Sequence, residues 1–366
     1  MLQGPSQGSE LRFASVQTLV ERGIRGGVYP GAVVVIGRRD TVLYARGFGH
    51  LSWARGAPRP SAQETRWDLA SLTKVVATAS AAMVLVDEGR VALDAPVSTY
   101  LPRFIGFGRE LITVRMLLDH TSGLKPYLAL YRLADSRNRA LDVLYEAIPE
   151  RIPGSSPKYS DLNAILLGLL IEAVTGETLD AFAGREVFAP LKLSSTTFRP
   201  ALTGVLSLAP SYSERGRPIS GRVNDLNAYL LGGVAGHAGL FSTGNDVARF
   251  AQAWLRKGGT PEGSWVSATS MQEFLRRTTQ SGTRMLGWDT PEQGVRRASI
   301  YGELAGPETF GHTGWTGTML WVDPGRDLFL VFLTNRSLAP KAPRSITALH
   351  SLRTSLSDLV IRLAQR

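Results

Sequence analysis

The sequence contains no cysteine among its 366 residues. Disulfides, thiolate metal ligands and cysteine nucleophiles are therefore excluded, although the compartment is not, because the absence of cysteine suits either side of a bacterial membrane. Histidine is also scarce, and its spacing is not typical of metal ligands. We therefore expect no metal site and no cofactor. The five histidines are His50, His120, His237, His312 and His350.

Lysine and long apolar runs are also scarce. Six lysines accompany 35 arginines, and the net charge is +10. The arginines are spread along the chain and not clustered with aromatics, so we expect no nucleic-acid partner. We interpret them as a solvated basic surface, with attraction to anionic substrates as the second interpretation. No stretch reaches the roughly 18 apolar residues of a membrane span, and none is expected.

Residues 1–9 lack the charged and then apolar pattern of a signal peptide, and we interpret them as a disordered lead. Localisation stays open: extracytoplasmic (periplasmic or secreted) if a signal was removed, and otherwise cytoplasmic. Hydrophobic residues make up 43% of the chain, enough for a large core and two lobes. The sequence does not indicate an oligomeric state.

Apolar periodicity predicts strands at both ends of the chain and helices between them. This order predicts an α/β fold in which one antiparallel sheet is assembled from both termini and flanked by helices. We expect an α/β lobe from residues 10–74 and 240–366, and a mainly helical, all-α lobe from 75–239 whose loops at 125–140 and 200–235 line a cleft. The predicted elements are a helix at 10–26, strands at 32–36 and 41–45, a helix ending near 88, strands at 318–322 and 328–334, and a helix at about 345–365.

Ser71 and Lys74 lie one helical turn apart at the start of a long apolar helix, so their side chains share a face. The pattern Ser-x-x-Lys occurs three times in the chain. The other two matches contain Gly123 and Pro157, which disfavour a regular helix. A serine at a helix start also lies at the positive end of the helix dipole, where developing negative charge is stabilised.

A serine nucleophile needs a base, and lysine serves only where its neutral amine is favoured. Tyr159 follows a loop and immediately precedes an apolar helix, so it can point into a cleft and shuttle a proton. Ser160 or Asp161 can cap that helix, which is compatible with a catalytic tyrosine. Near the C-terminus, small residues around His312 let a substrate lie along a strand edge. His312 itself is interpreted as binding a substrate carboxylate or tuning proton transfer, or as structural.

Taken together, these stretches resemble the serine penicillin-recognising superfamily, in particular its class C β-lactamase, D-alanyl-D-alanine peptidase and family VIII esterase branch. The resemblance extends over nearly the whole chain and implies a β-lactamase/transpeptidase-like fold. The matching motifs are Ser71-Leu72-Thr73-Lys74, Leu117-Leu118-Asp119-His120-Thr121-Ser122-Gly123-Leu124, Tyr159-Ser160-Asp161 and His312-Thr313-Gly314.

The resemblance implies that Ser71 is acylated, that Lys74 is its base partner, and that Tyr159 is the second base and proton shuttle. It implies an oxyanion hole formed by the backbone N–H groups of Ser71 and Trp315. The substrate-binding strand would carry His312, Thr313 and Gly314.

Two residues depart from the family pattern. Asp161 stands where Asn is usual, and its negative charge near Lys74 favours the protonated amine, which puts Tyr159 forward as the main base. His312 stands where class C β-lactamases have Lys, a substitution seen in the peptidase branch. Both departures lower the expectation of an efficient β-lactamase.

The segments 223–228 and 232–242 resemble, more specifically, amidase-like members of this superfamily that are associated with peptidoglycan recycling. Asp225 and His237 are the candidate substrate-side residues there, with loop structuring as the alternative. We therefore predict an acyl-enzyme serine hydrolase that acts on a small-molecule or peptide substrate. The substrate is expected to be a cell-wall-derived peptide or muramyl amide or a small carboxylic ester. A β-lactamase is the alternative, and a non-turnover penicillin-binding sensor is the second alternative.

Overall fold

The computed structural model describes residues 12–202, 207–261, 263–278, 281–292, 300–339 and 342–365. The expected disordered lead at residues 1–9 lies outside these ranges. The larger sheet is antiparallel, with strand order β11-β12-β13-β1-β2. Its strands are β1 (Gly31–Gly37), β2 (Val42–Gly49), β11 (Phe310–Thr313), β12 (Met319–Asp323) and β13 (Leu328–Thr334).

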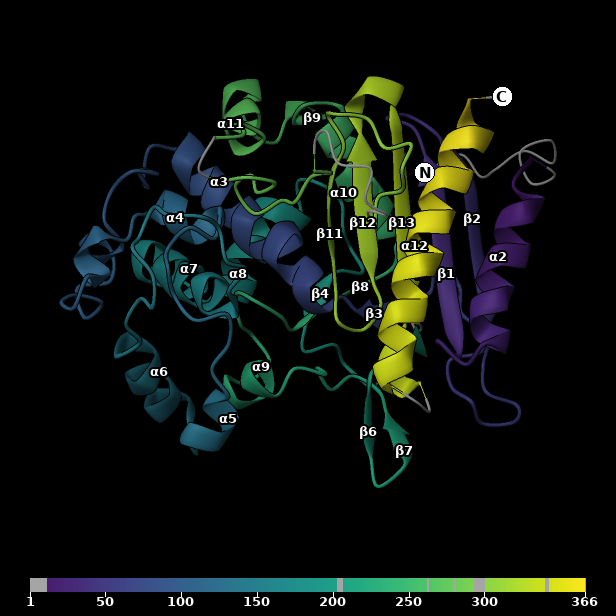
Figure 1. Ribbon diagram of the computed structural model, residues 1–366, viewed down its shortest axis with the longest axis horizontal. Coiled ribbons are helices and arrows are strands. Elements are labelled where there is room, and N and C mark those ends of the chain that lie inside the picture. The colour runs from purple at the N-terminus through teal and green to yellow at the C-terminus, as the bar shows by residue number, and fades with distance from the viewer. Residues whose placement is uncertain are drawn as a thin grey trace.

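Both faces of this sheet are covered, which explains why β1, β12 and β13 are buried at every position and consist mostly of apolar residues. In β1, Val33 and Val35 point into one core cluster, whereas Ala32, Val34 and Ile36 point into the other. Figure 1 shows α2 (Ala14–Arg25) and α12 (Ala342–Ala364) on one side of the sheet. On the other side, α10 (Gly244–Leu255) packs on β1, β12 and β13.

The helices drawn on the left of Figure 1 come mostly from the middle of the chain. They are α3 (Ser80–Asp87), α4 (Val114–Leu118), α5 (Leu130–Leu133), α6 (Arg137–Tyr145), α7 (Asp161–Thr175), α8 (Leu179–Ala183), α9 (Leu226–Leu230) and, further along the chain, α11 (Ala268–Phe274). The segments Lys74–Ala79 and Gly184–Phe188 are π-helical. Short 3₁₀ turns are Ala70–Leu72, Val97–Thr99, Arg109–Leu111, Pro324–Arg326 and Arg336–Leu338.

A second, smaller sheet has the strand order β4-β8-β3-β5. It delivers the chain to the Ser71 turn, because β3 ends two residues before Ala70. Its strands are β3 (Thr65–Asp68), β4 (Thr197–Phe198), β5 (Ser207–Leu208) and β8 (Leu240–Ser242). Two hairpins are formed by β6 (Tyr212–Glu214) with β7 (Arg217–Ile219), and by β9 (Gly259–Thr260) with β10 (Gly263–Ser264).

The prediction of one sheet from both termini is confirmed, because β1 pairs with β13 from Ala32↔Thr334 to Gly37↔Phe329. The prediction that residues 125–140 form a loop is wrong, since α5 and the start of α6 lie within them. By length and mean hydropathy alone, Ala70–Asp87 could cross a membrane, although it contains Ser71, Lys74 and Asp87. That stretch is 83% buried inside the protein, and the other candidate is a helix pair bent by 80°.

Gly236 allows the segment before β8 to touch α7. A Cβ atom at this position would lie 1.9 Å from the carbonyl oxygen of Ala164, and the Gly236 carbonyl itself accepts a hydrogen bond from Thr78 Oγ1 at 2.7 Å. We expect Gly236→Ala to lower the free energy of unfolding by about 3 kcal/mol, because backbone must move to admit the methyl group.

The matched control is Gly184→Ala, since the added methyl group there meets nothing within 4 Å and the backbone is helical. This variant should be neutral or up to about 1 kcal/mol more stable. Urea unfolding of both variants measures the difference. Equal midpoints for the two would contradict the close approach to α7.

Candidate active site

The Ser71 turn is strained, and Asp68 holds it in place. Ala70 has φ +48°, which is uncommon for a residue with a side chain. Its N–H donates to Asp68 Oδ1 at 2.9 Å. Asp68 Oδ2 accepts from Ser211 Oγ at 3.0 Å and from the Asn224 N–H at 2.7 Å. Burial raises the pKa of Asp68 to about 6, although these hydrogen bonds by themselves lower it. Asp68 therefore fixes the Ser71 turn and the segment around Asn224 to each other.

The prediction that Ser71 and Lys74 share a regular α-helical turn is wrong, because Ser71 lies in a 3₁₀ turn and Lys74 begins a π-helix. The predicted proximity nevertheless holds. Lys74 Nζ donates to Ser71 Oγ at 2.9 Å. The other two Ser-x-x-Lys matches lie outside helices, as predicted from Gly123 and Pro157.

Lys74 is buried and surrounded by acceptors. Besides Ser71 Oγ, its ammonium donates to the His237 carbonyl at 3.1 Å and pairs with Asp161 Oδ1 at 2.7 Å. Burial by itself lowers the pKa of Lys74, but the charge of Asp161, together with Tyr159, outweighs that effect and raises the pKa above its usual value. Lys74 is therefore a cation that donates to Ser71, and a cation cannot take up the serine proton.

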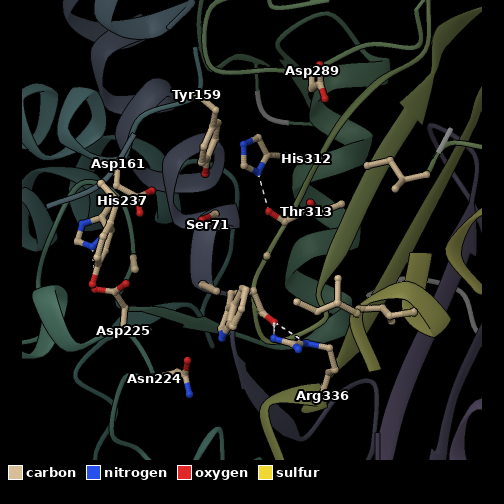
Figure 2. Close-up of a pocket in the computed structure, with 18 of the residues that line it drawn as sticks. Ser71, Tyr159, Asp161, Asn224, Asp225, His237, Asp289, His312, Thr313 and Arg336 are labelled. Carbon is tan, nitrogen blue, oxygen red and sulfur yellow. Dashed lines mark hydrogen bonds and ion pairs between the residues drawn. The ribbon is translucent and has the colours of Figure 1, made fainter. Parts of the chain in front are cut away.

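Tyr159 lies at the end of the loop that leads into α7, with its ring between two imidazoles. The ring centroid is 4.7 Å from that of His120 and 5.8 Å from that of His312. Burial, together with nearby cations, lowers the pKa of both histidines, so both are neutral. His120 Nδ1 accepts the Ser160 N–H at 3.3 Å, which anchors the backbone next to Tyr159. Figure 2 shows the Tyr159 hydroxyl end directed toward Ser71.

Two cations, Lys74 and Arg284, face the Tyr159 ring. Lys74 Nζ lies 5.0 Å from the ring centroid, and the Arg284 guanidinium carbon lies 5.2 Å from it. The Tyr159 hydroxyl points toward Ser71 (Figure 2), whereas the Lys74 ammonium already donates to Ser71 Oγ. Tyr159 is thus better placed than Lys74 to exchange a proton with Ser71.

The edge strand β11 forms the opposite wall. It pairs with β12 from Phe310↔Val322 to Thr313↔Met319, and its outer edge is bridged by Asp289 at Gly311. Beyond β11, Gly314 is packed against the Ser71 turn, since a Cβ atom there would lie 2.5 Å from the Leu69 carbonyl oxygen. This close approach requires glycine and packs the segment before Trp315 against the Ser71 turn.

Two buried arginines orient the peptide groups that follow. Arg353 Nη2 donates to the Gly314 carbonyl at 3.2 Å, and Arg336 Nε donates to the Trp315 carbonyl at 2.9 Å. In a trans peptide the C=O and the following N–H point in opposite directions. The Trp315 N–H is therefore turned away from Arg353. Among the described residues, neither this N–H nor that of Ser71 has a protein acceptor. Paired free N–H groups can bind an oxyanion.

Asp225 and His237 form a further pair, with His237 Nε2 at 2.8 Å from Asp225 Oδ1 (Figure 2). Burial opposes ionisation of Asp225, but the charge of His237 and its hydrogen bond outweigh burial and hold the pKa of Asp225 well below its usual value. The Asp225 carboxylate also accepts the Ala228 N–H at 2.8 Å as the N-cap of α9. His237 Nδ1 is buried and has no partner among the described residues.

One cavity of about 1030 Å³ brings the predicted residues together. Its lining includes Ser71, Tyr159, Asp161, Asp225, His237, His312, Thr313, Gly314 and Trp315, and Lys74 lies beneath Ser71. Tyr127 and Tyr131 come from the 125–140 segment expected to line the cleft, whereas sequence reasoning did not single out Arg284, Asp289, Arg336 or Arg353, which also line the cavity. These four arginine and aspartate residues come from loops, a 3₁₀ turn and α12, and they share no spacing with the motifs.

Across the part of the chain that the structure describes, no group of three or more His, Asp or Glu side chains is placed to hold a metal ion. Around Ser71 the cavity offers the serine hydroxyl, the Tyr159 phenol, the Lys74–Asp161 ion pair and backbone donors. This set suits nucleophilic attack on a carbonyl carbon with transfer of one proton.

Comparison with known proteins agrees with this chemistry. The family model described as Beta-lactamase matches residues 16–352. A candidate D-alanyl-D-alanine carboxypeptidase of Escherichia coli (strain K12) is 31% identical over 350 residues, which is 86% of this chain and 80% of the relative. The N-acetylmuramyl-L-alanine amidase of Bacillus subtilis (strain 168) is 30% identical over 370 residues, 92% of this chain and 83% of that protein.

Solved structures show the same fold. EstCE1, a hydrolase with promiscuous acyltransferase activity, superposes with a TM-score of 0.74 at 24% identity, covering 97% of this chain and all of that one. A class C β-lactamase from Rhodobacter sphaeroides gives a TM-score of 0.73 at 21% identity, covering 98% and 99%. The predicted β-lactamase/transpeptidase-like fold is confirmed.

The ion pair between Lys74 and Asp161 makes a direct test of the site's electrostatics. Asp161→Asn keeps the shape of the side chain and removes its charge. We expect the free energy of unfolding to fall by about 1–3 kcal/mol, because a buried ammonium loses its anion while the amide oxygen still accepts a hydrogen bond.

The control is Asp142→Asn, because Asp142 pairs with Arg103 at the surface, where the two side chains are 40% and 63% exposed. That variant should lose less than about 1 kcal/mol. Guanidinium unfolding at one pH compares the two. Losses of the same size would show that the buried Lys74–Asp161 pair stabilises the protein no more than a surface ion pair does.

Proposed function

Because the chain belongs to the β-lactamase family and is a serine hydrolase of amides and esters, we propose that it works through a covalent acyl-enzyme at Ser71. We further propose that its substrate is a cell-wall-derived peptide or muramyl amide, or a small carboxylic ester. The observation that carries the mechanism is the Lys74 ammonium, which pairs with Asp161 and donates to Ser71 Oγ.

In the acylation step, Ser71 Oγ attacks the substrate carbonyl carbon and passes its proton to Tyr159 in the phenolate form. The N–H groups of Ser71 and Trp315 bind the oxyanion. Collapse of the tetrahedral intermediate breaks the bond to the leaving group, which takes the proton from Tyr159. Lys74 stays charged throughout and stabilises the negative oxygen of Tyr159 or Ser71.

In the deacylation step, a water molecule attacks the ester carbon of acylated Ser71. Tyr159 accepts a proton from this water, and the same N–H groups bind the second oxyanion. Ser71 Oγ leaves and recovers the proton from Tyr159, which restores the phenolate. The step releases the acyl group as a carboxylic acid and balances in protons without another reactant.

The substrate class is supported by the names of the relatives and by the chemistry of the cavity. The amidase and the candidate carboxypeptidase act on cell-wall amides by their names. Arg284 lines the cavity next to Tyr159 and offers a cation to a carboxylate on the leaving group. A cavity of about 1030 Å³ admits a ligand much larger than a simple acetyl ester.

The nucleophile is tested by intact-protein mass spectrometry with a penicillin, a short-chain nitrophenyl ester and a muramyl peptide. We expect an acyl adduct or turnover in the wild type and neither in Ser71→Ala. Ser155→Ala is the matched control, because Ser155 belongs to another Ser-x-x-Lys match and its Oγ has no hydrogen-bond partner among the described residues.

Equal behaviour of wild type and Ser71→Ala with all three compounds would rule out the proposal. Two other outcomes would change the substrate assignment and keep the nucleophile. A persistent penicillin adduct without turnover would favour a sensor, and rapid clearance of the penicillin would favour a β-lactamase.

The proton shuttle is tested by Tyr159→Phe, which keeps the ring between His120 and His312 and removes the hydroxyl. We expect kcat/KM for the nitrophenyl ester to fall about 10²–10⁴-fold, the usual contribution of general acid–base catalysis. Tyr127→Phe is the control, because Tyr127 lines the same cavity and is 44% exposed. If both variants keep most of the wild-type rate, Tyr159 is not the proton shuttle.

A further inference from the structure

We propose that a second cavity, next to the Ser71 cavity, binds a carboxylate carried on the acyl part of the substrate, with Arg222 as the residue that recognises it. The proposal rests on the proposed function, because it assigns an acyl side to the Ser71 cavity. The cavity has a volume of about 870 Å³.

The two cavities are neighbours with a shared wall. Tyr131 of α5 and Leu226, the first residue of α9, line both of them. A chain bound at Ser71 can therefore extend past these two side chains into the second cavity. The rest of its lining is largely apolar and includes Val223, Leu230 and Phe241, which suits an aliphatic stem.

The charge of the second cavity is positive. Among the described residues that line it there is no Asp or Glu, and the two charged ones are Arg199 and Arg222. Arg199 is already paired with Asp180. Arg222 forms no ion pair among the described residues, and its Nε is buried without a hydrogen-bond partner. A guanidinium in this state lacks an acceptor, and a carboxylate supplies one.

The orientation of Arg222 is already fixed for this task. Its guanidinium carbon lies 3.9 Å from the Tyr212 ring centroid and 4.1 Å from that of Tyr229, so the two rings cover both faces. Stacking leaves the N–H edge as the part that can bind a planar anion. The backbone beside it is also anchored, because the nearby Asn224 N–H donates to Asp68.

The second cavity lies on the acyl side of Ser71. Tyr159 protonates the leaving group in the proposed mechanism, so the leaving group extends past Tyr159 toward Arg284 and Asp289. Figure 2 shows Ser71 between Tyr159 on one side and Asn224 and Asp225 on the other. Leu226 follows Asp225 directly and lines the second cavity, so the proposal assigns that cavity to the acyl group.

The experiment compares nitrophenyl monoesters of adipic and suberic acid with the nitrophenyl esters of hexanoic and octanoic acid. We expect wild type to prefer one of the acids over its neutral partner. Arg222→Gln should lower kcat/KM for that acid about 10- to 100-fold, the size of a lost charge-assisted pair, and change the neutral esters less than about threefold. Arg217→Gln, at an exposed position outside both cavities, should behave as wild type.

Equal losses on acidic and neutral esters in Arg222→Gln, or no preference in wild type, would overturn the subsite. Ser71→Ala separates this from failure of the proposed function: if it still hydrolyses the neutral esters, the acyl-enzyme itself is wrong. Binding is measured independently by calorimetric titration of Ser71→Ala with adipic monoanilide and hexananilide. Tighter binding of the acid, lost on adding Arg222→Gln, supports the subsite, and equal binding of the two overturns it.

Discussion

The buried ammonium of Lys74 is the interaction on which the rest of the site depends. It joins three segments far apart in sequence, because it donates to Ser71 Oγ, donates to the His237 carbonyl and pairs with Asp161. A buried cation with one anion and two further acceptors is stable only while all three stay in place. The same charge that organises the cleft also keeps Lys74 from acting as a base. In the proposed mechanism, proton transfer therefore falls to Tyr159, whose ring lies beside this cation.

The other side of the cleft is held through the backbone. Gly314 packs on the Ser71 turn, and Arg353 on α12 fixes the Gly314 carbonyl, so a helix on the far side of the sheet determines where the Trp315 N–H points. Burial lowers the pKa of Arg353 to about 9, because this guanidinium is withdrawn from water. Rigid support of this kind places donors before the reaction begins and removes the cost of orienting them.

Much of this could be predicted from the sequence, and the exceptions have physical reasons. The short motifs around Ser71, Tyr159 and His312 could be recognised from their local sequence context. The apolar strands near both termini likewise predict one sheet. The strained Ala70 turn and the π-helix after it could not be predicted, because Asp68 and tertiary packing impose them against local preference. Arg284, Arg336 and Arg353 leave no pattern either, since each acts on a neighbour that only folding brings close. The proposed boundaries of the two lobes, and the roles of Asp225 and His237, remain predictions.

The protonation state of Lys74 during catalysis tests the account most directly. The chain has only six lysines, so the ε-nitrogen signal of Lys74 can be assigned in protein labelled with ¹⁵N-lysine by comparison with Lys74→Arg. The account predicts an ammonium signal that persists across the whole pH range in which the enzyme turns over an ester, and that titrates at lower pH in Asp161→Asn. A neutral amine at the pH of maximal activity would contradict it, because Lys74 would then be free to serve as the base for Ser71.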